Sequence, residues 1–464
     1  RKICKKCLFL RPKMTEAERI LDLEGKLSHA LARIAELESQ LLRHQGLKNS
    51  RNSHIAPSGD LSRKNQSLRE KSDKPVGGQK GHKGHTLEMS DTPDVVEAIY
   101  PKYCNKCGLS LEGKTFRLES RRQVVDIPSI VPIITEHQNF GTDCTCGHHQ
   151  CGTFPAGVDN HIQYGPNIQS LVVYQSCYQF MPFQRLSDFF KKICQTHISK
   201  GTLENILRRS AGKARPVYEK LQQAIAISFF VGSDETGYKL NSKKGWFWVW
   251  QNAMITFIVA ATSRSKQVIE AYFPQGLPNA TLCSDRLAAQ LSTFSKASQL
   301  CLAHLLRDLN FLIERQESDW PGQFKTLLKK AIALKQKQVQ YTKNDPEVRL
   351  LEQELDSLLN DEQLQLLIKE PEKYKNVITF FNQMRKFRNH IFPFLYDQLV
   401  PYDNNGSERA IRMVKVKTKI SGQFKSLHQE FAILRSVIDT TIKNGQPVFD
   451  AIQALVKIQP PAAG

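Results

Sequence analysis

The chain has 464 residues, of which 65 are Lys or Arg and 45 are Asp or Glu, giving a formal net charge of +20 and an isoelectric point near 9.4. This length allows about two to four domains with buried cores and excludes a small scaffold held together by disulfides. The basic excess favours a polyanionic partner, nucleic acid before a membrane surface. The charge is concentrated, because residues 43–83 carry ten basic and three acidic side chains and residues 409–425 carry six basic and no acidic ones.

The cysteines indicate metal binding in a reducing compartment. Their number, 11, is odd, and most of them are closely spaced, which is untypical of secreted disulfide frameworks. The longest apolar stretch, near residues 253–261, is too short to cross a bilayer, and no signal peptide is visible. We therefore expect a soluble, cytoplasmic protein. Because the chain begins with Arg1, we expect its natural start to lie elsewhere.

Residues 1–48 are predicted to form a coiled-coil helix that joins two copies of the chain. Apolar residues recur there in alternating steps of three and four, at Ile20, Leu23, Leu27, Ala30, Ile34, Leu37 and Leu41. An amphipathic helix packed on its own domain is the alternative. Residues 49–98 are predicted to be a basic flexible linker, in which Lys80 and Lys83 lie among glycines and are suited to bind a phosphate backbone.

Residues 99–158 are predicted to form a zinc-binding element. Cys104 and Cys107 have the spacing of a knuckle, in which one tight turn presents two thiolates. The second pair is irregular: Cys146 is expected to act with either Cys144 or Cys151. A strand is predicted over residues 123–135, between the two pairs. Free buried cysteines are the alternative.

Helices and strands then alternate in long blocks. Residues 159–228 are predicted to be a helical DNA-binding or spacer region, with helix starts at Pro166 and Ser199. Residues 229–310 follow the order β-β-β-α-β-α-β, typical of a ribonuclease H-like sheet, with strands over 229–240, 245–251, 254–261, 281–283 and 298–301 and a helix over 266–272. Residues 311–399 are predicted to be an inserted helical subdomain, and residues 400–464 complete the core with further helices. The expected fold class is multidomain α+β.

Three acids in this region are candidate metal ligands. Asp234 lies within the first strand, Asp285 follows the fourth strand, and Glu408 lies in the first turn of a helix. Carboxylates converging from separate elements can hold two magnesium ions against a phosphodiester. Because side chains alternate along a strand, Glu235 is expected to face away from Asp234. Each acid alone is also consistent with a solvated side chain.

The helix that carries Glu408 is strongly basic. Arg409, Arg412, Lys415 and Lys419 follow that acid, and the last three share one face by their spacing, so we predict that they bind DNA phosphates. A solvated charged face is the alternative. His304 lies in a Cys-x2-His sequence with Cys301 and is predicted to have a structural role, with a second zinc site or a phosphate or water contact as alternatives.

Taken in order, these motifs resemble those of the insertion-sequence-66 family of bacterial DDE transposases over nearly the whole chain. The matching segments are Asn49–Ser53, Pro57–Asp60, Gly77–Gly84, Cys104–Gly108, Ser233–Thr236, Cys301–Asp308 and Asn404–Arg412. The chain departs from the family pattern at Arg286, where glycine is common, at Leu302, where tryptophan is common, and in the compressed second cysteine pair.

The resemblance implies that the catalytic triad is Asp234, Asp285 and Glu408, with Mg²⁺ or Mn²⁺ as cofactor. It also implies a zinc site at Cys104, Cys107 and the Cys144/Cys146 region, terminal inverted repeats and target DNA as partners, and accessory proteins encoded by the same element. The expected activity is cleavage at element ends and joining of the freed 3′-hydroxyl to target DNA. The alternatives are a DNA-binding regulator or decayed transposase that does not cut, and a structure-selective nuclease that cuts without joining.

Overall fold

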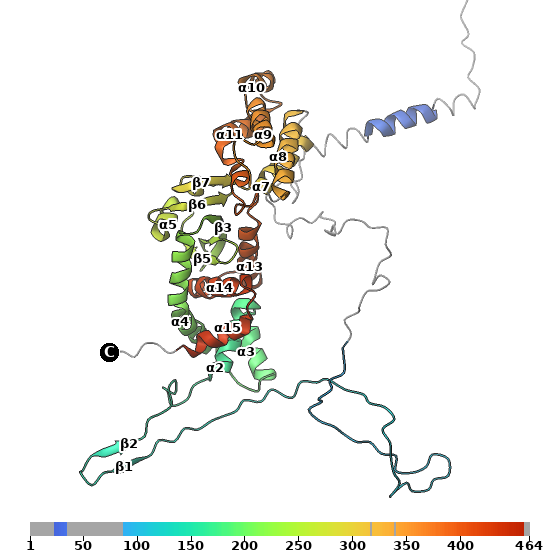
Figure 1. Ribbon diagram of the computed structural model, residues 1–464, viewed down its shortest axis with the longest axis vertical. Coiled ribbons are helices and arrows are strands. Elements are labelled where there is room, and N and C mark those ends of the chain that lie inside the picture. The colour runs from blue at the N-terminus through green and yellow to red at the C-terminus, as the bar shows by residue number, and fades with distance from the viewer. Residues whose placement is uncertain (1–22, 35–86, 316–317, 338–339, 459–464) are drawn as a thin grey trace, which may run out of the picture. The chain divides into compact units, whose positions relative to one another are not determined.

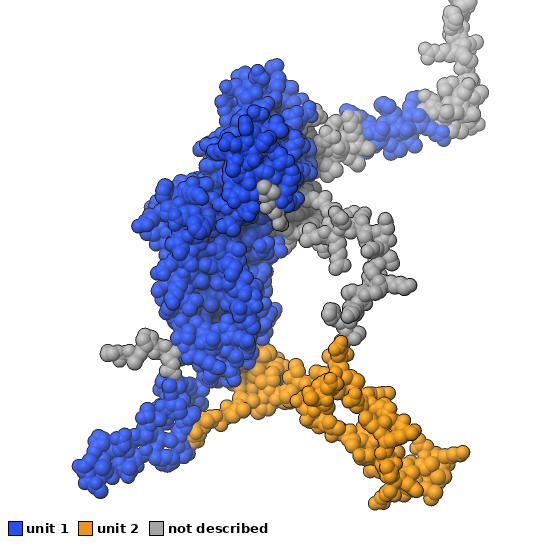
Figure 2. Space-filling view, in the orientation of Figure 1, with its two compact units in different colours: residues 1–63, 137–188, 198–464 blue, residues 64–136, 189–197 orange. Residues whose placement is uncertain are grey.

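The computed structural model describes residues 23–34, 87–315, 318–337 and 340–458. The chain divides into two compact units, the first comprising residues 1–63, 137–188 and 198–464 and the second residues 64–136 and 189–197 (Figure 2). Within the described residues, no helix combines the length and apolar character needed to cross a membrane. Cys4, Cys7, Lys80 and Lys83 lie outside the described residues.

Residues 23–34 form a helix whose side chains are all exposed. Leu23, Leu27, Leu31 and Ile34 give it an exposed apolar stripe. The described residues do not test whether this stripe pairs with a second chain, and the coiled coil therefore stays a prediction.

The cysteine-rich region has less regular structure than its sequence predicts. Strands β1 (Gly141–Asp143) and β2 (His149–Cys151) form an antiparallel hairpin. The predicted strand over 123–135 is wrong, because no residue in that stretch adopts strand structure. Its β-favouring side chains, such as Val124 and Ile133, are more than 90% exposed. A strand needs a paired neighbour and a face to bury, and these residues have neither.

The predicted helical region consists of α2 (Pro166–Val173), the π-helix η2 (Tyr174–Tyr178), α3 (Phe183–Lys192) and α4 (Lys200–Ala226). Both predicted helix starts are confirmed. Pro166 occupies the first helical position, where its missing N–H costs nothing. The hydroxyl of Ser199 caps α4 by accepting a hydrogen bond from the backbone N–H of Thr202.

The central sheet has five strands in the spatial order β5-β4-β3-β6-β7 (Figure 1). Strands β3 (Phe230–Leu240), β4 (Lys243–Gln251) and β5 (Thr256–Ala261) form an antiparallel meander, and β6 (Leu277–Ser284) and β7 (Ser295–Leu300) add in parallel to β3. Helix α5 (Lys266–Tyr272) precedes β6, and α6 (Ala288–Leu291) precedes β7. The predicted order β-β-β-α-β-α-β is therefore found, in a mixed α+β fold.

Helix α14 (His428–Lys443) closes the free edge of the sheet at β5. Ser436 Oγ accepts a hydrogen bond from the backbone N–H of Ile258, and Thr440 Oγ1 accepts one from that of Thr256. An uncovered edge strand would present such donors to other chains. Helix α14 also packs against α4, which contacts the same strand (Figure 1).

Helices occupy the chain between β7 and the C-terminal segment, as predicted. They are α7 (Leu302–Arg315), α8 (Trp320–Gln336), α9 (Pro346–Leu358), α10 (Asp361–Ile368), α11 (Lys375–Lys386), the 3-10 helix η3 (Arg388–His390) and α12 (Pro393–Tyr396). They share one apolar core that includes Trp320, Phe324 and Phe381. Each amphipathic helix buries its apolar stripe there, so this segment has its own core beside the sheet.

The chain then returns to the sheet through α13 (Asn405–Ser421), which packs against β3 and β4. Gly422 ends this helix with a φ of 72°, and Gly445 follows α14 with a φ of 66°. Both values lie in the left-handed region, where glycine is favoured. Pro447 immediately precedes α15 (Val448–Lys457), so these three residues mark the ends of the C-terminal helices.

Candidate active site

Asp234 lies on β3, and Asp285 directly follows the end of β6, the strand beside it. Strands β3 and β6 are parallel and pair Gly232 with Cys283, and Asp234 and Asp285 each come two residues later. Adjacent strands are about 4.8 Å apart, and residues level with each other on parallel strands point to the same face. The register therefore brings together two acids that are far apart in the sequence.

Pairing with β4 defines the face on which Asp234 lies. Asp234 is opposite Val249, and Gly232, two residues earlier, is opposite Gln251. Glu235 is opposite Trp248 and therefore belongs to the other face. The expectation that Glu235 faces away from Asp234 is confirmed.

Glu235 has its own partners on that other face. Its Oε1 accepts a hydrogen bond of 2.8 Å from Arg264 Nε, and its Oε2 accepts one of 3.1 Å from Gln290 Nε2. Gln290 also donates to the hydroxyl of Ser233. Burial raises the pKa of Glu235, and the charge of Asp285 adds to this, while Arg264 acts in the opposite direction. Glu235 is thus held as part of the protein interior.

Asp234 is only partly exposed and carries a strongly shifted pKa. Burial raises the pKa of Asp234 to about 8, and the negative charges of Glu235 and Asp285 contribute to the rise. The backbone N–H of Glu235, which donates to Asp234 Oδ1 at 2.8 Å, and the charge of Lys415 act in the opposite direction. The site therefore concentrates negative charge that a cation would relieve.

Glycine makes the approach of α13 to this face possible. A Cβ at Gly232 would lie 2.5 Å from Asn404 Oδ1 and 2.5 Å from Gln251 Nε2, and a Cβ at Gly406 would lie 2.6 Å from Gln251 Nε2. Such distances are shorter than any normal contact. The first turn of α13 therefore lies directly against the β3–β4 pair.

Hydrogen bonds fix the same turn to the sheet. Asn404 Nδ2 donates to the carbonyl of Ser233 at 2.7 Å, one residue before Asp234, and Ser407 Oγ donates to Asn404 Oδ1 at 2.7 Å. The backbone N–H of Asn404 donates to Cys301 Sγ at 3.2 Å. Asn404 occupies the N-cap position of α13, but its side chain makes no capping hydrogen bond to the helix backbone and instead joins the helix to β3.

The carboxylate of Glu408 is directed toward α7. Its Oε1 accepts a hydrogen bond of 2.7 Å from Arg307 Nη2 and lies 3.7 Å from His304 Nε2. Among the described residues, Asp234, Asp285 and Glu408 do not form a group whose ligand atoms all lie within 4.8 Å of one another, whereas Cys301, His304 and Glu408 do. The structure thus brings the two aspartates together and leaves Glu408 on the α7 side.

The basic side chains that were predicted to share a face of α13 are exposed. Arg409, Arg412, Lys415 and Lys419 are all exposed. The charge of Lys415 lowers the pKa of both Asp234 and Glu235, so this lysine lies within electrostatic reach of the acids. Lys417, between them, is buried and donates to the carbonyl of Ser176 at 3.3 Å.

Arg286, directly after the second acid, turns away from it. Its guanidinium is bonded to Asp308 and donates to Gln383 Oε1 at 2.8 Å, and it lies over the ring of Phe380, 5.5 Å from the centroid. These partners belong to the helical segment. The Asp285 carboxylate instead accepts a hydrogen bond from the backbone N–H of Leu287.

The cysteines predicted to bind zinc lie in two tight turns, one in each unit. In one, the backbone N–H groups of Lys106 and Cys107 and the Cys107 thiol lower the pKa of Cys104. In the other, the amide and thiol of Cys146 lower the pKa of Cys144. Amides and a second thiol converging on one sulfur suit a thiolate ligand pair. Each turn by itself suits a pair of thiolate ligands, and zinc binding stays a prediction.

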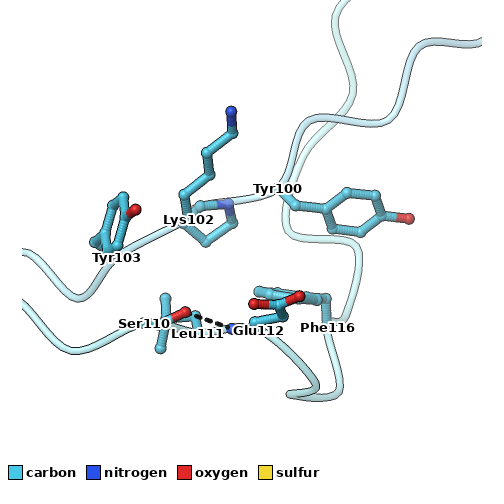
Figure 3. A pocket seen from close by; sticks show the side chains of 8 residues that line it. Tyr100, Lys102, Tyr103, Ser110, Leu111, Glu112 and Phe116 are labelled. Carbon is cyan, nitrogen blue, oxygen red and sulfur yellow. Dashed lines mark hydrogen bonds between the residues drawn. The ribbon is translucent and has the colours of Figure 1, made fainter.

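A hollow in the second unit is lined by residues that precede and follow the Cys104–Cys107 turn in the sequence (Figure 3). Tyr100, Lys102 and Phe116 contribute to its lining, and the rings of Tyr100 and Phe116 are 5.1 Å apart between centroids. None of its lining residues is one of the three acids.

Several residues of the site were not identified from the sequence. Arg264 and Gln290 bind Glu235, and Arg307 binds Glu408. Arg307 lies in the same short motif as His304, and its place in that motif is the sequence feature that could have identified it. Arg264 and Gln290 stand in segments with no motif and are placed only by the tertiary fold.

Paired acids on a sheet beside an exposed basic helix are typical of proteins that act on nucleic acid backbones. The family model described as Transposase IS66 family matches residues 161–430, more than half of the chain. The chain therefore belongs to the IS66 family of transposases, as its motifs predicted. A second model, described as a family of unknown function (DUF6444), matches residues 10–88. No curated protein matches the chain.

Proposed function

We propose that this transposase cuts DNA at the ends of a mobile element and joins the freed 3′-hydroxyl to target DNA, using Asp234, Asp285 and Glu408 as its metal-binding triad. The observation that carries the proposal is the position of Asp234 on β3 and of Asp285 directly after the parallel strand β6, close enough for the charge of Asp285 to raise the pKa of Asp234. The strand order β5-β4-β3-β6-β7 supports a ribonuclease H-like core.

The donor set suits Mg²⁺ or Mn²⁺, since both prefer carboxylate oxygens. Bound at these acids, such ions would activate the attacking oxygen and stabilise the leaving one. Asp234 supports this assignment because burial, and after it the charges of Glu235 and Asp285, raise its pKa, and a bound cation would stabilise the ionised carboxylate. Glu408 completes the triad when its carboxylate leaves Arg307 and turns toward the sheet.

The exposed basic face of α13 is proposed to bind the DNA backbone beside the scissile bond. Lys415 is the residue best placed for this role, because its charge already acts on Asp234. Arg409, Arg412 and Lys419 extend the same positive surface along α13. Phosphate contacts of this kind position DNA and carry no base specificity. Lys80 and Lys83 are proposed to add contacts from the linker.

Zinc at Cys104, Cys107, Cys144 and Cys146 is proposed to stabilise the cysteine-rich element. The amides and paired thiols within each turn support these two thiolate pairs, with Cys151 as an alternative ligand. Dimerisation through the N-terminal helix and interaction with accessory proteins of the element remain proposals based on the apolar stripe and on the family.

The test is a strand-transfer assay with DNA that carries the terminal repeats of the element. With Mg²⁺ or Mn²⁺, the parent protein should give cleaved and joined products, and Asp234→Ala should give neither while binding the same DNA with unchanged affinity. Glu219→Ala, on the exposed surface of α4, is the matched acidic control and should retain activity. Cutting by Asp234→Ala at the parental rate would refute the triad assignment.

One observation favours the second candidate, a DNA-binding protein without catalysis. Glu408 is bound to Arg307 and does not lie with the two aspartates. Binding without any cleaved product, in the parent as in Asp234→Ala, would establish that candidate. Cleaved products without joined ones would instead indicate a nuclease.

A further inference from the structure

We propose that Cys301, His304 and Glu408 form a second metal site, selective for a borderline divalent cation such as Zn²⁺ and distinct from the Asp234–Asp285 pair. The Cys301 thiol, the His304 imidazole and the Glu408 carboxylate offer ligand atoms that all lie within 4.8 Å of one another. They come from three places: the junction after β7, the first turn of α7 and the first turn of α13. A sulfur, a nitrogen and an oxygen ligand form a set typical of zinc and unsuited to magnesium.

The spacing of the ligand atoms fits coordination better than hydrogen bonding. His304 Nε2 and Glu408 Oε1 are 3.7 Å apart, beyond the usual hydrogen-bond range. Two ligands that are each about 2.0–2.1 Å from a tetrahedral zinc ion lie roughly 3.4 Å apart. A small movement of either side chain would therefore bring the two ligand atoms to the separation expected around a zinc ion.

Backbone N–H groups face the Cys301 sulfur, although its burial opposes the charged thiolate. The sulfur is buried, and burial raises the pKa of Cys301 to about 12. The backbone N–H groups of His304 and Asn404 act in the opposite direction, and the Asn404 group donates to Sγ at 3.2 Å. Amides directed at sulfur stabilise its negative charge when a cation displaces the thiol proton.

Arg307 supplies a contact of the kind that supports metal-binding carboxylates. Its Nη2 donates to Glu408 Oε1 at 2.7 Å, which orients the carboxylate toward α7. Ligating carboxylates in metal sites are commonly hydrogen-bonded in this way. The positive charge of Arg307 opposes a dication, so binding depends on the thiolate and imidazole, and this selects zinc-like ions over magnesium.

The two sites share Glu408, and this gives the second site a functional consequence. A cation bound between Cys301 and His304 would keep Glu408 on the α7 side. Glu408 could then not complete the proposed triad. Zn²⁺ would therefore oppose Mg²⁺-dependent strand transfer. This consequence rests on the proposed function, whereas the metal site itself does not.

The site can be tested with Co²⁺ as a spectroscopic probe of the full-length protein. Cobalt bound to a thiolate gives a near-ultraviolet charge-transfer band, and tetrahedral cobalt gives visible d–d bands. Because other cysteines take up cobalt as well, the measurement is the difference between parent and Cys301→Ser at saturating Co²⁺. Cys177→Ser removes another buried thiol outside the site and is the matched control.

We expect Cys301→Ser and His304→Gln each to bind about one cobalt ion fewer per chain than the parent and Cys177→Ser. Excess Zn²⁺, but not Mg²⁺, should remove the difference band. His304→Gln keeps the test valid should Cys301→Ser not fold. Equal spectra and stoichiometry in all four proteins would overturn the proposal. The readout requires no strand transfer, so its failure is separate from failure of the proposed function.

Discussion

Replacing Asp234 with asparagine should stabilise the metal-free protein at high pH. The pKa of Asp234 is raised from its usual value of 3.8 to about 8, mainly by burial. A carboxyl group whose folded-state pKa lies above its unfolded value contributes stability that is complete below the unfolded pKa. This contribution is lost as the pH rises through the folded one. Ionised Asp234 therefore destabilises the fold most strongly above pH 8, and asparagine removes this cost.

The magnitude follows from the shift. A rise of roughly 4 pH units, at about 1.4 kcal/mol each, sets an upper limit of about 6 kcal/mol. Because Asp234 is partly exposed, solvent screening reduces the expected effect to on the order of 2–3 kcal/mol. The free energy of unfolding of Asp234→Asn, relative to that of the parent, should rise between pH 4 and pH 8 and stay constant above pH 8.

The assay is thermal or urea unfolding in EDTA at pH 4.5 and pH 9, repeated at pH 7.5 with Mn²⁺. Glu219→Gln, on the exposed surface of α4, should show the same difference from the parent at both pH values. Mn²⁺ at 100 times its dissociation constant should stabilise the parent by about 2.7 kcal/mol and the variant by less. If Asp234→Asn shifts stability equally at both pH values, or Mn²⁺ stabilises both proteins equally, the reasoning is wrong.

Two further predictions concern α13. Gly232→Ala should lower the free energy of unfolding, measured in urea, by about 1–3 kcal/mol and abolish strand transfer, because its Cβ would overlap Asn404. The control Gly212→Ala has open space around it in α4, so it should raise the free energy of unfolding by about 0.5–1 kcal/mol. Lys415→Gln should weaken DNA binding and reduce the slope of log affinity against log salt by about 1, while Lys220→Gln on α4 should not; unchanged slopes would place the DNA elsewhere.

The sequence predicted those parts of the fold that depend on local patterns. Alternation along β3 assigned Asp234 and Glu235 to opposite faces, and the cap at Ser199 and the helix over 266–272 were found where they were expected. Strand β6 is longer than predicted. It starts at Leu277, where pairing with β7 holds a stretch that has little strand propensity of its own.

Contacts between distant segments could not be predicted in this way. Arg307 and Glu408 are separated by 101 residues, most of them in the helical segment, and no local pattern indicates that they meet. The strand predicted over 123–135 failed for the opposite reason. Its residues have suitable propensity but no partner, and pairing is a tertiary property.

Arg286 illustrates how the fold accommodates a departure from the family pattern. A guanidinium beside Asp285 would neutralise one of the paired acids, yet the side chain extends into the helical segment and binds Asp308 and Gln383. Asp308 of α7 binds Arg286, and the residue before it, Arg307, binds Glu408. Of these two arginines, only Arg307 therefore pairs with an acid of the proposed triad. The helical segment therefore does more than lengthen the chain. It binds the Arg286 guanidinium away from Asp285, while Arg307 of α7 binds Glu408.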